Sequence, residues 1–324
     1  MTDNKVSIVS PCYNVGRFIP RFLESIIDQH YAPIELILVD DGSTDDTAEQ
    51  IEHYRDRLSA AGIELVYKYK ENGGQASAVA LGLQFVTGEF LIWPDPDDFL
   101  LPNSISHRVK YLRQHLDCGM VRSNGIVYHE SDVDKPLRKI STCSNTGYIE
   151  DFLKHRIPWC PGCYMIRMRD FDKANPKREI ADYRIGQNFQ MLIPVAYYYP
   201  CHYLDEALFA YVIRDDSHSH LKQSYEKASH RLDQYETCVR DTLAIIPADT
   251  SRYLRIHHAF ILKSHYRLAW EKGEKADLKK YELSLRKCGE FGGEEWLMKC
   301  ADYSRVSCMA LKGYSAIKRR ILKK

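Results

Sequence analysis

The chain has 324 residues, 44% of them hydrophobic and 27% charged, and a formal net charge of +1, a composition typical of a folded globular protein. The near-neutral charge argues against nucleic acid as a partner, and no apolar run approaches the roughly 20 residues that span a bilayer. The polar start shows no secretory signal, so we expect a cytoplasmic protein whose ten cysteines are reduced thiols.

The first hundred residues alternate between short apolar runs and helical patterns. Strands are predicted at residues 6–9, 34–39, 64–68 and 90–93, and helices at residues 18–27, 48–58 and 78–85. Ser43 and Asp45 are candidate caps for the second helix, and Gly73-Gly74 opens the third. Single helices between strands predict a mainly parallel sheet with helices on both faces.

Polar clusters follow three of these strands. They are residues 12–14, 40–41 and 95–98, after the first, second and fourth strands. Ligands bind such sheets outside the carboxyl ends of the strands, so the sequence predicts a site where the three clusters meet.

The pattern is less regular after about residue 115. Further strands are predicted at residues 163–166, 197–203 and 208–213, and part of a buried helix at residues 191–196. From about Ser219 onward the sequence predicts helices only. One apolar stripe in that region consists of Leu232, Tyr235, Val239, Leu243 and Ile246.

The cluster Asp95-Pro96-Asp97-Asp98 is a candidate metal site. Three carboxylates cannot share a dry site without strong repulsion, which a divalent cation removes. Oxygen ligands suit Mg²⁺ or Mn²⁺, and such a metal stabilises a departing diphosphate as a Lewis acid. The simpler interpretation is a solvated acidic turn shaped by Pro96, which the matching loops at neighbouring strand ends make less favourable.

Asp41 and Tyr13 are candidates for contacts with a nucleotide. A carboxylate at a strand end can accept the imide N–H of uracil or a ribose hydroxyl, and Tyr13 can stack on the base. The simpler interpretations are a helix cap at Ser43 or Asp45 and an ordinary half-buried tyrosine.

Four stretches together carry a family resemblance. They are residues 6–14, residues 35–45, Asn72-Gly73-Gly74, and the run from Gly88-Glu89-Phe90 to Asp95-Pro96-Asp97-Asp98. In order and spacing they resemble the family 2 glycosyltransferases of the GT-A fold. The resemblance is specific over residues 5–103, continues weakly to about residue 220 and does not cover the C-terminal hundred residues.

The resemblance implies an α/β fold in which a GT-A-type nucleotide-binding sheet covered by helices precedes a mainly helical C-terminal region. We expect a GT-A domain at residues 1–218 and a helical region at residues 219–324. The domain divides into a nucleotide-binding half, residues 1–103, and an acceptor half, residues 104–218.

The resemblance also implies roles for single residues. The loop of Pro11 and Tyr13 holds the donor base together with Asp41. Asp95 lies near the ribose, and Asp97 binds the Mn²⁺ or Mg²⁺ on the diphosphate. The donor is a nucleoside-diphosphate sugar, with UDP favoured, and the acceptor is a glycan or a lipid-linked glycan in surface polysaccharide assembly.

Members of the family are typically inverting, and here the chain departs from their pattern. A carboxylate usually deprotonates the acceptor hydroxyl, which displaces the nucleoside diphosphate in one step. Where members usually carry an acidic pair ahead of an apolar helix, this chain has Gln187 and Asn188, and an amide cannot accept that proton at neutral pH. Asp182 is the nearest upstream carboxylate and the candidate base, with Asp215 or Asp216 next.

The stretch from Arg214 to His220 resembles the family loop that approaches the diphosphate. Arg214 is a candidate to neutralise phosphate charge, and His218 or His220 to complete the metal shell. The simpler interpretation is a polar turn in which Ser217 or Ser219 caps the next helix.

Two other activities remain as alternatives. The Gln187-Asn188 departure suggests a catalytically silent sugar-nucleotide or glycan-binding protein on the same fold. A nucleotidyltransferase is less favoured, because the loop after the first strand has only Gly16 and Arg17 where a Gly-rich basic loop holds a triphosphate.

The motif Cys160-Pro161-Gly162-Cys163 has three interpretations. Zinc needs two more ligands, for which only scattered candidates exist, and a redox role needs a thioredoxin-like context. The favoured interpretation is a turn that enters a strand near the acceptor site, with Trp159 able to stack on a sugar ring.

The last thirteen residues form a basic tail. Residues 312–324 contain six lysines and arginines and no acidic residue, and apolar residues recur among them at spacings of three and four. The tail predicts an amphipathic helix that binds reversibly to an anionic membrane at the inner face. The competing interpretation is that its apolar stripe packs on the catalytic domain or a partner subunit.

Overall fold

The structure is a computed structural model that describes residues 2–144, 147–214 and 224–301. The chain divides into two compact units. Unit 1 comprises Met1–Leu221 and Cys238–Thr250, and unit 2 comprises Lys222–Thr237 and Ser251–Lys324. The domain boundary predicted at residues 218 and 219 lies outside the described residues.

The first half of unit 1 is a parallel sheet in the order β3-β2-β1-β4. Its strands are β1 (Thr2–Cys12), β2 (Ile34–Asp40), β3 (Ile63–Tyr69) and β4 (Gly88–Ile92). Every residue of β2 is buried, as expected for a parallel strand covered on both faces. The four predicted strands and their parallel pairing are therefore confirmed.

The second half of unit 1 turns this sheet into a mixed one. Antiparallel β8 (Tyr164–Arg167) joins the edge of β4, and the order continues through β6 (Met120–His129), β9 (Cys201–Ile213) and β5 (Phe99–Leu100). Strand β7 (Arg138–Ile140) pairs with β6, which completes a nine-stranded sheet among the described residues. Strand β8 confirms the strand predicted at residues 163–166, and β9 contains the one predicted at residues 208–213.

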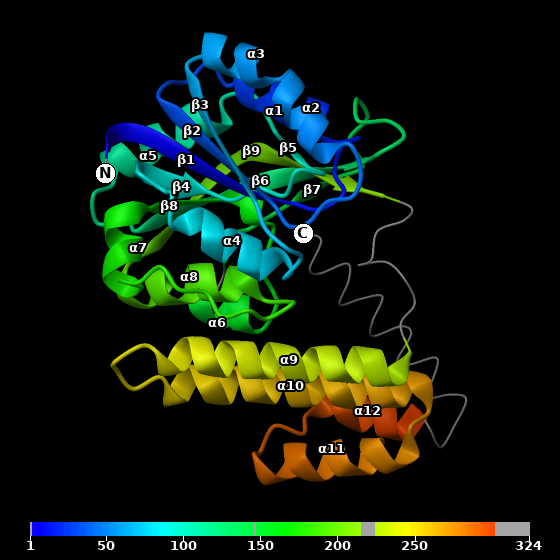
Figure 1. Ribbon diagram of the computed structural model, residues 1–324. Helices are drawn as coiled ribbons and strands as arrows, with labels where there is room; N and C mark the ends of the chain where they lie inside the picture. The colour runs from blue at the N-terminus through cyan, green and yellow to red at the C-terminus, as the bar shows by residue number, and fades with distance from the viewer. Residues whose placement is uncertain (1, 145–146, 215–223, 302–324) are drawn as a thin grey trace. The chain divides into compact units, whose positions relative to one another are not determined.

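Helices cover both faces of this sheet. Figure 1 shows α1 (Ile19–Ile27), α2 (Thr47–His53) and α3 (Arg55–Ala60) on one face, and α4 (Gln75–Leu83), α7 (Met168–Ala174) and α8 (Gln187–Tyr198) on the other. The remaining helices of this half are α5 (Ser104–Gln114), α6 (Tyr148–Leu153) and the short 3₁₀ helix η1 (Pro161–Cys163). Gly82 lets α4 lie close to the sheet, because an added Cβ would be 2.5 Å from Cγ1 of Val9.

Two predicted elements of unit 1 are wrong in their bounds. The run at residues 197–203 is not one strand: Tyr197 and Tyr198 end α8, which confirms and extends the helix predicted at residues 191–196, and β9 begins at Cys201. Pro200 explains the break, because the residue before a proline avoids helical geometry, and Tyr199 is extended. The single helix predicted at residues 48–58 is divided at Tyr54 into α2 and α3.

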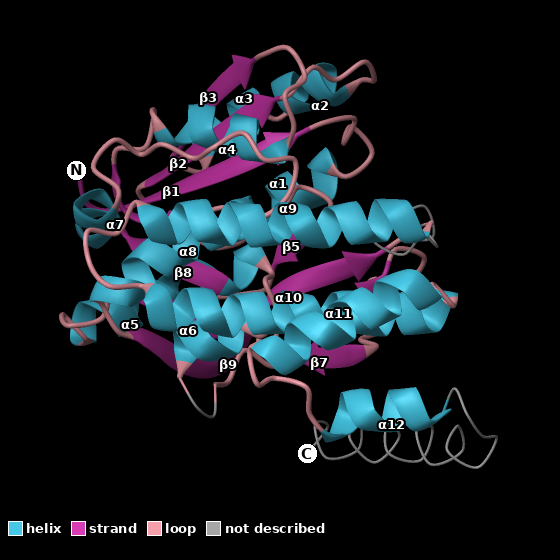
Figure 2. Ribbon diagram, turned by 90° about the horizontal axis from the view of Figure 1, so that it is seen from below, coloured by secondary structure: helices cyan, strands magenta, loops and turns pink. Residues whose placement is uncertain are grey.

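Unit 2 is helical among its described residues. Helix α9 (Tyr225–Ala244) begins in unit 2 and ends in unit 1, and α10 (Ser251–Lys272), α11 (Lys275–Lys287) and α12 (Gly293–Ala301) follow (Figure 2). The unit has its own apolar core, formed by Leu262, Tyr266, Tyr281, Leu285 and Met298. The predicted helical character of this region is thus confirmed. Among the described residues, no helix is both long enough and apolar enough to span a membrane.

Candidate active site

The loop after β4 carries the acidic cluster at the carboxyl end of the parallel sheet. The N–H of Asp98 donates to the carbonyl of Asp95 at 3.1 Å, which closes a turn around Pro96. Ser10 Oγ holds the carbonyl of Pro94 at 2.8 Å from the neighbouring strand. On the other side, Arg21 Nη2 donates to the carbonyl of Asp97 at 2.6 Å.

The three carboxylates of this loop converge. Asp95, Asp97 and Asp98 each bring one ligand oxygen within 4.8 Å of the others. Burial and the charge of Asp97 raise the pKa of Asp95 to about 7, and burial with both neighbouring carboxylates raises that of Asp98 well above its ordinary value. Ionising all three carboxylates therefore costs free energy, and a bound cation lowers that cost.

This donor set fits Mg²⁺ or Mn²⁺, because hard oxygen atoms converge where they otherwise repel each other. Asp98 is only 2% exposed, and its Oδ1 accepts the N–H of Val212 at 2.8 Å, so it braces the loop against β9. Asp95 and Asp97 are only partly buried, which leaves them as the more accessible ligands.

Arg214 follows β9 and reaches the same loop. Its Nη2 lies 3.0 Å from Oδ2 of Asp97, and its guanidinium lies over the ring of Phe18 with 5.0 Å to the centroid. The structure thus brings the predicted phosphate residue to the predicted metal ligand. His218, with His220, Asp215 and Asp216, lies outside the described residues.

Asp41 is buried, and both oxygens of its carboxylate accept hydrogen bonds from other groups of this chain. Oδ1 accepts the N–H of Gly73 at 2.9 Å and the ammonium of Lys70 at 2.7 Å, and Oδ2 accepts the N–H of Gly74 at 2.7 Å. Asp41 therefore shapes the loop that leads into α4.

Gln75 connects the Asp41 loop to the acidic cluster. It is the first residue of α4, directly after Gly74, and its Nε2 donates to Oδ1 of Asp95. The sequence prediction missed Gln75, Lys70 and Arg21, because each acts through a contact distant in sequence. The position of Gln75 directly after the family-like Gly73-Gly74 was the available signal for it.

The loop after β1 presents Tyr13 to solvent, with 52% of the residue exposed. Pro11 is buried opposite Val39 near the end of β1, beyond the part of the strand that pairs with β4, where its missing N–H is tolerated. Asn14 joins this loop to the next one, donating its N–H to Ser43 Oγ at 3.0 Å.

The N-cap residue of α2 is Asp46, so neither predicted cap, Ser43 or Asp45, stands at that position, although Asp45 bonds to the first turn. Asp45 accepts the N–H of Thr47, the first residue of α2, at 3.1 Å. Ser43 instead bonds to Asn14, so the prediction that it caps this helix is wrong.

Asn188 is held as an amide between the indole of Trp93 and the backbone carbonyl of Trp159. Its Oδ1 accepts from Trp93 Nε1 at 2.8 Å, and its Nδ2 donates to the carbonyl of Trp159 at 2.8 Å. A carboxylate could accept from Trp93 but could not donate to Trp159. Gln187, its neighbour, is buried as the first residue of α8.

Asp182 is exposed on a segment that α8 and α9 hold in place. Gln190 bonds both the N–H and the carbonyl of Ala181, at 2.7 and 3.1 Å, and Tyr183 donates its hydroxyl to Asp241. The segment passes beside the Gly73-Gly74 loop: Cγ of Arg184 is 4.0 Å from the position of a Cβ on Gly74. Asp182 itself makes no hydrogen bond or ion pair with another described residue.

The Cys160–Cys163 motif is a turn of 3₁₀ helix that enters β8, which confirms the predicted turn and strand, while the nearby acceptor site stays a prediction. A hydrogen bond to Cys163 and burial raise the pKa of the Cys160 thiol well above its ordinary value, so it is not a reactive thiolate. Among the described residues, the acidic cluster is the only group of three or more potential ligands placed to hold a metal, which disfavours the zinc interpretation.

Comparisons with known proteins identify the family of this chain. A family model described as "Glycosyl transferase family 2" matches residues 7–174. An uncharacterized glycosyltransferase of Rickettsia typhi is 37% identical over 109 residues, 34% of this chain and 32% of the relative. The putative glycosyltransferase EpsE of Bacillus subtilis is 26% identical over 242 residues, 73% of this chain and 82% of the relative. The chain spans a third or less of the length of the first curated relatives it matches.

Two solved structures share the fold at low identity. TarS 1–349 of Staphylococcus aureus, in complex with UDP-GlcNAc, has a TM-score of 0.61 at 17% identity and covers 90% of this chain and 78% of its own. The mannosyltransferase PcManGT of Pyrobaculum calidifontis, in complex with GDP-Man and Mn²⁺, has a TM-score of 0.55 at 16% identity. The match covers 95% of this chain and 83% of PcManGT.

A parallel nucleotide-binding half, a mixed second half and an acidic loop between them define a glycosyltransferase domain of the GT-A fold. The chain belongs to glycosyl transferase family 2.

Proposed function

We propose that this chain transfers a sugar from a nucleoside-diphosphate donor, a UDP-sugar, to a hydroxyl of a glycan or lipid-linked glycan, with inversion and with Mn²⁺ or Mg²⁺. The observation that carries the proposal is the connected set around Asp95–Asp98. Gln75 ties it to the Asp41 loop, and Arg214 faces it from the end of β9. The UDP-GlcNAc complex of TarS and the GDP-Man and Mn²⁺ complex of PcManGT support a nucleotide-sugar donor and a metal.

Each residue has a role in this proposal. Tyr13 stacks on the base, and the loop that Asp41 shapes lies beside the nucleotide. Asp95 orients the ribose, and Arg214 neutralises phosphate charge once the donor replaces its contact with Asp97. Asp97, with Asp95 beside it, would hold the metal, which as a Lewis acid supplies charge stabilisation for the departing diphosphate.

The proton of the acceptor hydroxyl needs a base of this chain. Asp182 is our candidate, because its carboxylate is exposed and its backbone is held by Gln190 beside the Gly73-Gly74 loop. Asn188 does not accept this proton. It fixes Trp93, and so the start of the acidic loop, relative to Trp159 on the acceptor side.

The test is release of UDP from UDP-sugars with added Mn²⁺ and a panel of glycan acceptors. We expect Asp97→Ala to abolish turnover and leave the fold intact, because the residue lies in a loop, while the exposed Asp134→Ala serves as the matched control. Asp182→Asn should cut the rate by at least about a hundredfold with little change in donor binding.

Other outcomes of this test decide against parts of the proposal. Full activity of Asp97→Ala in excess chelator would contradict the metal site. Surviving activity of Asp182→Asn would place the base elsewhere. Donor binding by the wild type without turnover on any acceptor would favour the silent binding protein.

A further inference from the structure

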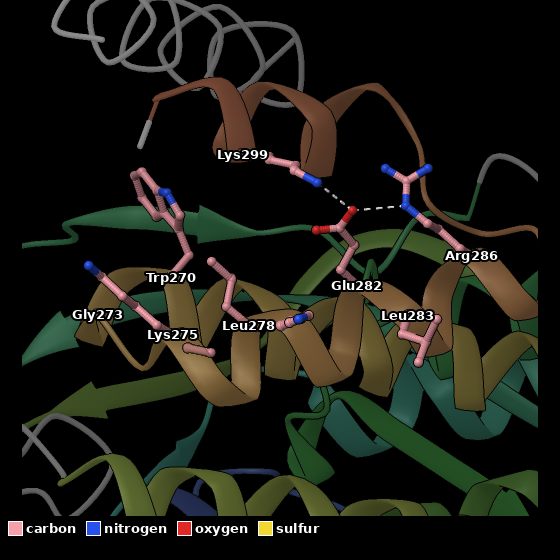
Figure 3. A pocket seen from close by; sticks show the side chains of 10 residues that line it. Trp270, Gly273, Lys275, Leu278, Glu282, Leu283, Arg286 and Lys299 are labelled. Atoms are coloured by element: carbon pink, nitrogen blue, oxygen red, sulfur yellow. Dashed lines mark hydrogen bonds and ion pairs between the residues drawn. The ribbon is translucent and has the colours of Figure 1, made fainter. Parts of the chain in front are cut away.

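Unit 2 contains a cavity that the proposed mechanism does not use. It has a volume of about 640 Å³, within the range of small-molecule sites. It lies among the end of α10, the turn at Gly273, one face of α11 and Lys299 of α12 (Figure 3). All of these residues belong to unit 2.

The spacing of α11 explains why its charges share this cavity. Lys275, Lys279, Glu282 and Arg286 are separated by three or four residues, so they lie along one face of the helix. Leu278 and Leu283 lie between them on the same lining. The opposite side of α11 packs into the core of unit 2 through Tyr281 and Leu285.

The charges of the lining are unbalanced. Four cations line the cavity against a single carboxylate. Glu282 Oε1 accepts from Arg286 Nε at 2.9 Å and from Lys299 Nζ at 2.7 Å, as Figure 3 shows. Lys275 and Lys279 have no ion pair with another described residue. The cavity therefore presents two ammonium groups to a ligand, which favours an anion.

The lining also has an aromatic wall. Trp270 is partly buried against the unit 2 core together with Leu278, which keeps the indole in place in the lining that also contains Lys275 and Lys279. An indole face packs well against the flat C–H face of a sugar ring, and the ammonium groups suit a phosphate. A concave site of this kind fits a discrete ligand better than a flat membrane surface does.

We propose that this cavity binds a phosphorylated sugar of the acceptor, with the ring against Trp270 and the phosphate between Lys275 and Lys279. The inference rests on the proposed function, because it assigns part of the acceptor glycan to unit 2. It gives the helical region a role in acceptor choice that is separate from the chemistry at Asp95–Asp98.

The experiment measures binding of glucose 6-phosphate, glucose and inorganic phosphate to the full chain by calorimetry. We expect saturable binding of glucose 6-phosphate that is tighter than that of the other two probes. The double variant Lys275→Gln/Lys279→Gln should weaken it by about tenfold or more. Trp270→Leu should weaken the binding of glucose 6-phosphate but not the binding of inorganic phosphate. The matched control is Lys280→Gln/Lys287→Gln, which removes the same charge from α11 outside the lining and should change nothing.

The proposal is overturned if binding of glucose 6-phosphate does not saturate. It is also overturned if the control variant weakens this binding as much as the lining variant does. Binding of phosphatidylglycerol vesicles through Lys275 and Lys279 without binding of glucose 6-phosphate would overturn it in favour of a lipid headgroup. UDP release by the same preparations separates the two proposals. Turnover without sugar-phosphate binding contradicts only the cavity proposal. Sugar-phosphate binding without turnover contradicts the proposed function, and with it the assignment of the bound sugar to an acceptor, but supports the sugar-phosphate site itself.

Discussion

At the scale of single residues, the site depends on carboxylates with different tasks. Asp98 is buried and braces the acidic loop, whereas Asp95 and Asp97 are accessible enough to meet a ligand. Asp41 serves neither task directly in this structure, because donors of the chain itself occupy its oxygens. The acidic residues of one short loop thus have different roles: Asp98 is structural, and Asp95 and Asp97 face a ligand.

Asp41→Asn tests the role of the Asp41 loop. The amide would place an N–H₂ group where two backbone N–H groups and an ammonium now donate, so at least one donor loses its acceptor. We expect the affinity for UDP to fall by about tenfold or more, because the loop beside the nucleotide loses an internal charge-assisted hydrogen bond worth roughly 1.5–3 kcal/mol and is held less well in its binding conformation. Calorimetry measures it, with exposed Asp46→Asn on the same loop as control. Unchanged affinity would show that the loop does not serve the nucleotide.

The sequence predicted the acidic loop well because its ligands are four consecutive positions after an apolar strand. It did not predict the tasks of Asp98 or Gln75, because those depend on Val212 and Asp95, which only the folded sheet brings near. The amides at residues 187 and 188 were recognised as a departure, but the contacts that Asn188 makes with the Trp93 indole and the Trp159 carbonyl were not.

At the scale of elements, a buried carboxylate joins the strands of the parallel half. Glu35 of β2 is 2% exposed and accepts from Thr87 N and Oγ1 at 2.6 Å, from Lys5 at 2.9 Å and from Ser7. Burial opposes its ionisation, but the hydrogen bonds from Ser7, Thr87 and Lys5 outweigh this and lower the pKa of its carboxyl. An apolar run with one glutamate predicts a strand but not this network.

Glu35→Gln should lower the free energy of unfolding by about 1–3 kcal/mol at pH 7, because several donors lose an ionised acceptor. The folded-state pKa lies below the unfolded value of about 4.3, so this stabilisation is present above that pH and is lost as pH falls through the folded-state pKa. The difference between wild type and variant in urea unfolding should therefore shrink below about pH 4. Glu64→Gln removes the exposed partner of Lys5 and should cost less than about 1 kcal/mol. A difference independent of pH would contradict the role of the charge.

The elements whose bounds were wrong show where local patterns fail. Tyr197–Tyr199 has strand propensity, but the buried residues of α8 extend the helix until Pro200 ends it. Strand β6 was not predicted, although it lies at the centre of the mixed half. Its apolar run is interrupted by Arg122, Ser123 and Asn124, which are buried in the structure because hydrogen bonds satisfy their polar groups.

At the scale of the whole molecule, the chain combines a family 2 domain with a helical unit that has its own core. The family match ends at residue 174, so the motifs that identify the first unit carry no information about the second. Its helices were predictable from periodicity, but the cavity was not, because it needs α10, α11 and α12 packed together.

The basic tail supplies the last prediction, and it concerns location. Residues 312–324 lie outside the described residues, and their sequence interleaves six basic residues with Tyr314, Ile317, Ile321 and Leu322. Each basic residue near an anionic leaflet contributes about 1 kcal/mol, an effect that salt screens, so we expect reversible binding rather than insertion. In liposome flotation the full chain should bind anionic but not neutral vesicles at low salt, and deletion of residues 312–324 should abolish this. The control Lys275→Gln/Lys279→Gln should still float, which separates the tail from the cavity of unit 2. If the full chain does not float, or the deletion floats as well as the full chain, the tail is not a membrane anchor, and packing of its apolar stripe on the protein or a partner subunit is favoured.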